Sequence, residues 1–237
     1  MSPNETRPEP FWSYRDVLLF VGIAFPSLLL SAALVRLVAP RLHFSEGFAD
    51  LLAQFLWYLI VFGFLGVLFR VVYRMPFWRS LGFAVPSPYA GLCFALGPLL
   101  AIVLSYIGTV LLKTPVIDSP FDKLLADRPT TVLFVIFGVV MGPLCEELAF
   151  RGFLMPLLMR SFGTVAGIVA TAALFGALHA PEYHRVWQYA VLIGSAGAVF
   201  GYVRYRTGST ASAALMHIGY NLIQFVAMWL RSSGPSS

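Results

Sequence analysis

The chain has 237 residues, of which 59% are hydrophobic and only 11% are charged. Soluble domains carry about 45–50% apolar and about 25% charged residues, so this composition excludes an ordinary soluble fold and favours a protein that lies in lipid. The net charge of +5 comes from basic residues scattered at the ends of apolar runs, as at Arg36, Arg70 and Arg204. That distribution is typical of anchoring at membrane interfaces, and no basic patch suggests a nucleic-acid partner.

Long apolar runs, separated by short polar connectors, follow one another along the chain. A polar tail is expected over residues 1–16, and a second short one over 231–237. Runs near the length that crosses a bilayer as a helix, about 20 residues, lie near 17–39, 49–73, 89–112, 131–159, 163–180, 187–204 and 210–230. They are longer and more uniformly apolar than barrel strands. We therefore predict an all-α fold, a polytopic transmembrane helical bundle with about seven, or seven to eight, spans.

We expect these helices to form a single domain. Residues 17–130 would supply N-terminal transmembrane helices, and residues 131–230 would supply the transmembrane core that carries the polar motifs described next. The sizeable polar loop runs from Lys113 to Thr130, so no second, soluble domain is predicted. The run at 131–159 is long enough to be tilted, or kinked at Pro143.

A set of polar residues lies inside the last apolar runs, where insertion scales put a charge at a cost of about 2.5–3.5 kcal/mol. Such residues by default face the interior of a bundle, pair with each other and carry function. They are Glu146, Glu147, Arg151, His179, His217 and Asn221.

Helical spacing separates the roles of the two glutamates. Glu147 and Arg151 are four residues apart, with the acid first, which is the favourable geometry for an ion pair. Glu146 is turned by about 100° from its neighbour and is therefore free for chemistry. The preceding Gly142-Pro143 pair should loosen the helix and free a carbonyl, which would admit water near Glu146.

The histidines and the asparagine complete a set that suits hydrolysis. His179 ends the fifth run, and Phe175, one turn earlier, could brace its imidazole. His217 and Asn221 are four apart and share a face, where they could donate hydrogen bonds to a developing oxyanion. A Glu and a His can together activate water. Taken singly, the motifs could be a buried ion-pair knot, an interfacial histidine and an interhelical polar clasp, but all three together are hard to attribute to packing.

These motifs resemble those of the CAAX protease and bacteriocin-processing family. Glu146-Glu147-Leu-Ala-Phe-Arg151 resembles its EExxxR motif. Phe175-Gly-Ala-Leu-His179 resembles FxxxH, and His217-Ile-Gly-Tyr-Asn221 resembles HxxxN. Order and spacing agree, and the resemblance covers about residues 131–225.

The resemblance implies an intramembrane endopeptidase. In it Glu146 and His179 would activate water, His217 and Asn221 would support the oxyanion, and Arg151 would hold Glu147. We expect metal-free glutamic catalysis without a cofactor, because HExxH is absent and an asparagine suits an oxyanion better than a metal. Zinc bound by Glu146, His179 and His217 is the alternative.

The expected substrate is a membrane-associated peptide or protein, and the expected location is a bacterial cell membrane. Two non-proteolytic alternatives stay open. One is a membrane scaffold or immunity protein that kept the fold without the activity. The other is a transporter or proton pathway, since intramembrane acids and histidines also mark those, although no repeated halves are visible.

Overall fold

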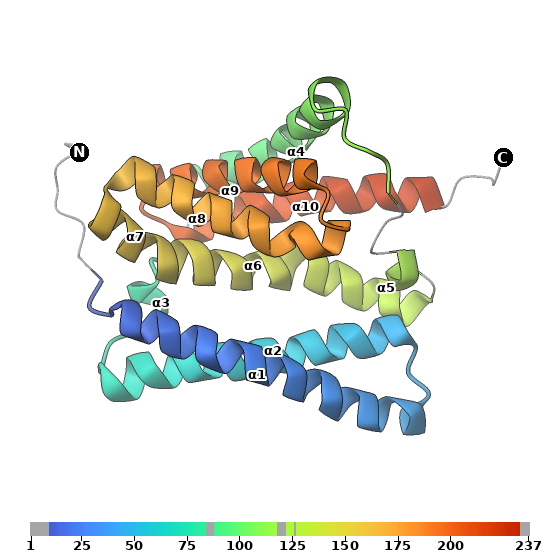
Figure 1. Cartoon of the computed structure of the whole chain (residues 1–237), viewed down its shortest axis with the longest axis horizontal. Helices are drawn as coiled ribbons and strands as arrows, with labels where there is room; N and C mark the ends of the chain where they lie inside the picture. Colours follow the sequence, from blue (N-terminus) through green and yellow to red (C-terminus); the bar gives the residue numbers. More distant parts are fainter. Residues whose placement is uncertain (1–9, 84–87, 118–121, 126, 233–237) are drawn as a thin grey trace.

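The computed structural model describes residues 10–83, 88–117, 122–125 and 127–232, and every regular element in these ranges is a helix (Figure 1). This confirms the predicted all-α class. The polar tails expected at the two ends lie mostly outside the described residues.

The N-terminal half forms a hairpin, a short helix and one separate long helix. Their bounds are α1 Tyr14–Val38, α2 Glu46–Val67 with a π-helical extension Leu68–Val72, α3 Phe77–Ser80, and α4 Ala90–Tyr106 with a π-helical extension Ile107–Leu111. Ser45 caps α2 by accepting a hydrogen bond from the Phe48 amide at 3.3 Å. The same Ser45 hydroxyl lies 2.9 Å from the Thr130 hydroxyl, which joins the hairpin loop to the helical segment that begins at Arg128.

One continuous helical segment of 35 residues, Arg128–Phe162, runs through the centre of the molecule. It comprises α5 (Arg128–Phe134), α6 (Gly142–Glu147) and α7 (Met155–Phe162), joined by π-helical stretches at Val135–Met141 and Leu148–Leu154. We call it the central helix. The irregularity expected near Pro143 is therefore present, as two wide turns on either side of α6.

Three more helices complete the C-terminal half. They are α8 (Thr164–His179, extended by a 3-10 turn Ala180–Tyr183), α9 (Trp187–Thr207) and α10 (Thr210–Ser232). Gly163 and Gly208 lie at positive φ of 82° and 69°, which lets the chain reverse tightly between neighbouring helices.

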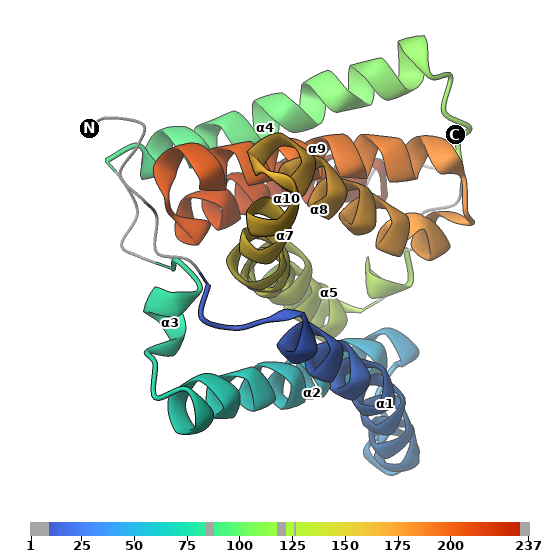
Figure 2. The same cartoon turned by 60° about the vertical axis from the view of Figure 1, so that its left-hand side comes forward.

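The helices are arranged around the central helix. The α1–α2 hairpin lies on one side of it, and α4, α8, α9 and α10 lie on the other (Figures 1 and 2). Trp12 fastens the hairpin side at one end, since its indole N–H donates to the Phe153 carbonyl at 3.0 Å among buried aromatic rings. Near the other end, Phe55 of α2 packs edge-on against Phe137 of the central helix at 5.4 Å between ring centres.

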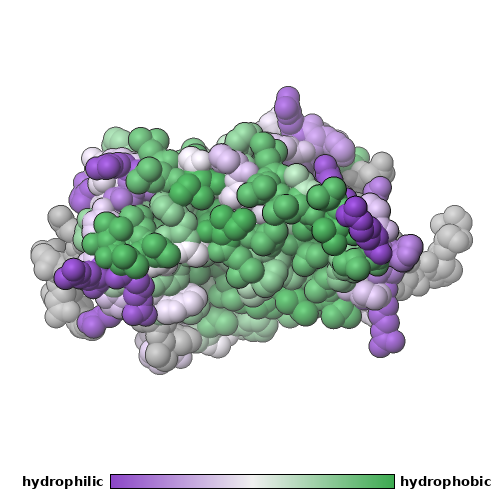
Figure 3. Space-filling model, turned by 90° about the horizontal axis from the view of Figure 1, so that it is seen from below, coloured by the Kyte–Doolittle hydropathy of each residue, from purple (hydrophilic) through white to green (hydrophobic). Residues whose placement is uncertain are grey.

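The surface agrees with a protein that spans a membrane. Six of the described helical segments are long and apolar enough to cross a bilayer. The seventh expected span corresponds to α9, which has the length but is less apolar. Hydrophobic residues cover the middle of the molecule and hydrophilic residues gather at its two ends (Figure 3). On α1, for example, Leu18 is 72% exposed and Phe25 66% exposed, as expected of side chains that face lipid. The chain is thus a multi-pass membrane protein.

Candidate active site

Pro143 shapes the central helix at the site. In the wide turn before it, the Gly142 amide bonds to the carbonyl five residues back, that of Phe137. In the same pattern, the backbone N–H of residue 143 would bond to the Gly138 carbonyl. Residue 143 is a proline, which has no N–H. The carbonyl that the sequence predicted to be freed is therefore that of Gly138.

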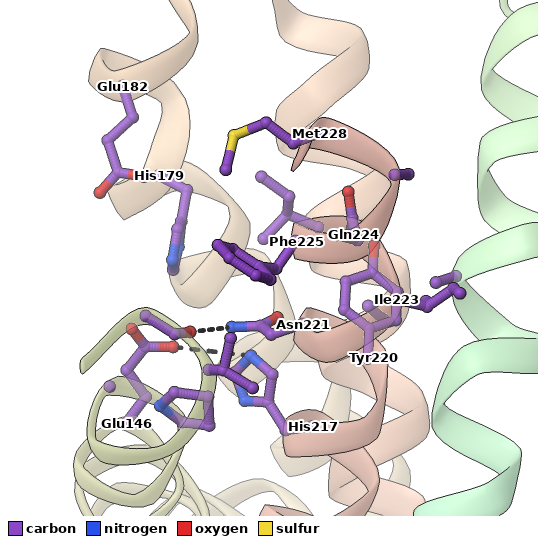
Figure 4. Close-up of a pocket in the computed structure, with 18 of the residues that line it drawn as sticks. Glu146, His179, Glu182, His217, Tyr220, Asn221, Ile223, Gln224, Phe225 and Met228 are labelled. Carbon is purple, nitrogen blue, oxygen red and sulfur yellow. Dashed lines mark hydrogen bonds and ion pairs between the residues drawn. The ribbon is translucent and has the colours of Figure 1, made fainter. Parts of the chain in front are cut away.

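Asn221 of α10 fills this gap. Its side-chain amide donates to the Gly138 carbonyl at 2.8 Å (Figure 4). The bond is partly buried, and it satisfies the backbone and joins α10 to the central helix. An amide nitrogen carries two hydrogens, and one of them stays available to a bound molecule.

Glu147 and Arg151 form the expected ion pair, with Arg151 Nη1 3.0 Å from Glu147 Oε1 and both side chains fully buried. The second arm of the guanidinium donates to the Gly197 carbonyl of α9 at 2.7 Å. Its central carbon lies 4.5 Å from the ring centre of Phe175 in α8, within cation–π range. Arg151 therefore binds three helices together.

Gly197 explains how the guanidinium reaches that carbonyl. A methyl group at this position would lie 2.8 Å from Arg151 Nη2 and 3.0 Å from the Phe175 ring. The absence of a side chain at Gly197 thus makes room for the arginine.

His217 lies between the Glu147–Arg151 ion pair and Glu146. Its Nδ1 lies 3.0 Å from Glu147 Oε1, and because a carboxylate only accepts, Nδ1 carries the hydrogen. Its Nε2 lies 3.8 Å from Glu146 Oε2. The ring stacks on Phe200 of α9 at 4.5 Å between ring centres, which fixes its plane.

His179 has its orientation set within its own helix. Its Nδ1 lies 2.8 Å from the Phe175 carbonyl, one turn earlier, so Nδ1 again carries the hydrogen. The Phe175 ring lies 4.5 Å from the imidazole, close to where it was expected as a brace. In the neutral ring Nε2 is then a proton acceptor, as general base chemistry requires.

The motif residues meet at one cavity of about 1010 Å³, which Glu146, His179, His217 and Asn221 all line. Glu146 comes from the central helix, His179 from α8 and the last two from α10 (Figure 4). The side chain of Glu146 is 26% exposed, whereas that of Glu147 is fully buried. The Glu146 carboxylate thus reaches the cavity, whereas the Glu147 carboxylate lies behind it among buried side chains.

The sequence did not single out several residues around this cavity. Phe200 lies in an apolar run, which gives no sign of a role at the site. Gln54 lines the cavity from α2, a helix without any motif. Glu182 is exposed, and it also lines the cavity near His179 (Figure 4).

The side-chain arrangement gives little support to the zinc alternative. Within the described part of the chain, no three His, Cys, Asp or Glu residues group closely enough to hold a metal ion. His217 donates from Nδ1 to Glu147, and metal-bound histidines often make the same contact with a carboxylate, so this bond does not distinguish the two mechanisms.

The comparisons with known proteins agree with the motifs. Residues 128–223 match the family model described as type II CAAX prenyl endopeptidase Rce1-like. No curated protein and no solved structure matches the chain. The match begins at the first residue of the central helix and ends just beyond Asn221, so it contains all three motifs. Residues 128–223, which carry all three motifs, thus match the Rce1-like family of type II CAAX prenyl endopeptidases, the family type that the motifs indicated.

Proposed function

We propose that the protein is an intramembrane endopeptidase in which Glu146 activates a water molecule for attack on a peptide carbonyl. The observation that supports this most is the meeting of Glu146, His179, His217 and Asn221 at one cavity inside a bundle of apolar helices. The family of residues 128–223 supports peptidase chemistry, and the assignment of individual roles is our proposal.

In the proposed reaction Glu146 and His179 share the work of the base. Glu146 takes a proton from water as the oxygen bonds to the carbonyl carbon, and the carbonyl oxygen becomes an oxyanion. His179 Nε2 can accept a hydrogen bond from the same water. The proton passes to the leaving amine as the carbon–nitrogen bond breaks, which yields a carboxylate and an amine without a covalent enzyme intermediate.

The oxyanion would be held from the α10 side of the cavity. Asn221 keeps one amide hydrogen for it beyond the hydrogen that Gly138 accepts. His217 donates its Nδ1 hydrogen to the Glu147 carboxylate, so it would donate to the oxyanion from Nε2 only when both ring nitrogens carry a hydrogen. Removing one such donor from a known oxyanion site costs about 10²–10³ in rate.

The substrate we propose is a membrane-associated peptide or protein, with prenylated CAAX-type peptides as the first class to test because of the family match. A bacterial cell membrane stays the expected location. Apolar helices around the cavity suit a substrate that is itself held in lipid.

The test is cleavage of fluorogenic CAAX-type peptides by purified protein in lipid, with and without a strong chelator. Glu146→Gln should abolish cleavage and leave folding intact. Glu46→Gln, which removes an exposed carboxylate in the first turn of α2, is the matched control and should cleave like wild type. Full cleavage by folded Glu146→Gln would refute the role of the base. Loss of wild-type cleavage with chelator, restored by zinc, would favour the metal alternative.

A further inference from the structure

The N-terminal hairpin reaches the site although no family match covers it. Leu51 and Gln54 of α2 line the cavity. One helical turn after Gln54, Tyr58 is buried, with only 8% of its surface exposed. Tyr58 thus brings a phenol into the interior from α2, a helix whose sequence indicates only a membrane span.

The Tyr58 hydroxyl has one settled contact. Gln54 Nε2 donates to its oxygen at 3.0 Å. That bond occupies a lone pair and leaves the hydroxyl proton for a different acceptor. Buried tyrosine hydroxyls usually find such a partner, because an unsatisfied donor is costly.

Glu146 offers the acceptor. A methyl carbon built on Gly142 would lie 3.9 Å from Glu146 Oε1 and 3.9 Å from the Tyr58 hydroxyl oxygen. Both oxygens therefore border the same small space, which the absence of a side chain at Gly142 leaves open. The carboxylate and the hydroxyl also act on each other electrostatically. A single water molecule in this space would have polar partners on two sides, as bridging waters require.

We propose that Tyr58 is a positioning residue for Glu146. Its hydroxyl donates to Glu146 Oε1 through one water beside Gly142, while Oε2 faces His217 at 3.8 Å. The carboxylate is thereby held between the hairpin and α10, with its orientation fixed from both sides. The hairpin then contributes to catalysis and does more than anchor the protein in lipid. This inference rests on the proposed role of Glu146 as the base.

The first experiment needs no substrate. The infrared difference spectrum between wild type and Glu146→Gln isolates the carboxyl bands of Glu146. Tyr58→Phe removes only the hydroxyl and keeps the ring, so it should shift these bands. Tyr73→Phe is the matched control, since it removes a hydroxyl that donates to Asp16 at 2.8 Å at the far end of the same hairpin. It should leave the bands unchanged. Unshifted bands in folded Tyr58→Phe would overturn the proposal.

The second experiment measures cleavage. Tyr58 is not among the described residues that line the cavity, so Tyr58→Phe should leave KM unchanged while kcat falls about tenfold or more. Tyr73→Phe should retain wild-type kcat. An unchanged kcat in Tyr58→Phe, or a raised KM alone, contradicts the positioning role. If wild type itself cleaves no peptide, the proposed function fails, and the infrared result still decides whether Tyr58 holds Glu146.

Discussion

Replacing Arg151 with methionine should destabilise the protein more than any surface substitution. Arg151 is fully buried, and it bonds to Glu147 Oε1 at 3.0 Å and to the Gly197 carbonyl at 2.7 Å. Its removal leaves a buried carboxylate without its charge partner, and breaking one side of a buried pair typically costs about 3–5 kcal/mol. We expect a loss of that size in the free energy of unfolding of Arg151→Met.

The double variant Glu147→Gln/Arg151→Met tests the cause of this loss. It removes the unpaired charge but keeps an amide oxygen that can accept from His217, so it should recover a large part of the lost stability. Unfolding of the detergent-solubilised protein by denaturant or heat measures the effect. Arg160→Met, a change at an exposed arginine of α7 that donates to the Pro10 carbonyl at 3.1 Å, is the control and should cost about 1 kcal/mol or less. Equal stability of wild type and Arg151→Met, or no recovery in the double variant, would refute the reasoning.

Three further changes probe other parts of the fold. Asn221→Ala leaves a partly buried backbone carbonyl without a donor and should lower the free energy of unfolding by about 1 kcal/mol, measured in the same assay; a loss of activity alone would deny its link to the central helix. Gly197→Ala crowds the buried guanidinium and should cost about 1–3 kcal/mol, whereas Gly22→Ala, with no atom within 4 Å, should be neutral or slightly stabilising. Hydrogen bonds from Thr130 lower the pKa of the Asp127 carboxyl from its ordinary value of about 3.9. The resulting stability is present above that value and lost as the pH falls through the lowered pKa, so acid unfolding curves of wild type and Asp127→Asn should converge at low pH and separate near neutrality.

The helical spans could be predicted from the sequence because lipid demands uniformly apolar segments of a fixed length. The run near 187–204 is the informative case. Its glycines and polar end residues lower its hydropathy, yet it forms the full-length helix α9 between Trp187 and Thr207. Those glycines are needed because α9 packs closely on α8 and makes room for Arg151. Packing inside the bundle thus weakens the very signal by which a span is recognised.

Two contacts among the motif residues could also be predicted, because each joins residues that are four apart on the same helix. Glu147 with Arg151, and Phe175 with His179, are contacts of this kind. The stacking of Phe200 on His217 and the approach of Tyr58 to Glu146 join residues far apart in the chain. No local spacing encodes such contacts, and an aromatic residue in an apolar run gives no sign of which neighbour it meets.

The Gly138–Asn221 bond shows how a backbone irregularity and a functional motif depend on each other. Pro143 removes a donor from the central helix three residues before Glu146, and the wide turn exposes the carbonyl toward α10. Asn221 supplies the missing hydrogen bond and is thereby fixed one turn beyond His217. In the proposed mechanism the same side chain also donates to the oxyanion, and it would gain from this arrangement because its position is set before a substrate arrives. Pro143 therefore leaves the Gly138 carbonyl without a backbone donor, and the hydrogen bond that replaces this donor orients Asn221.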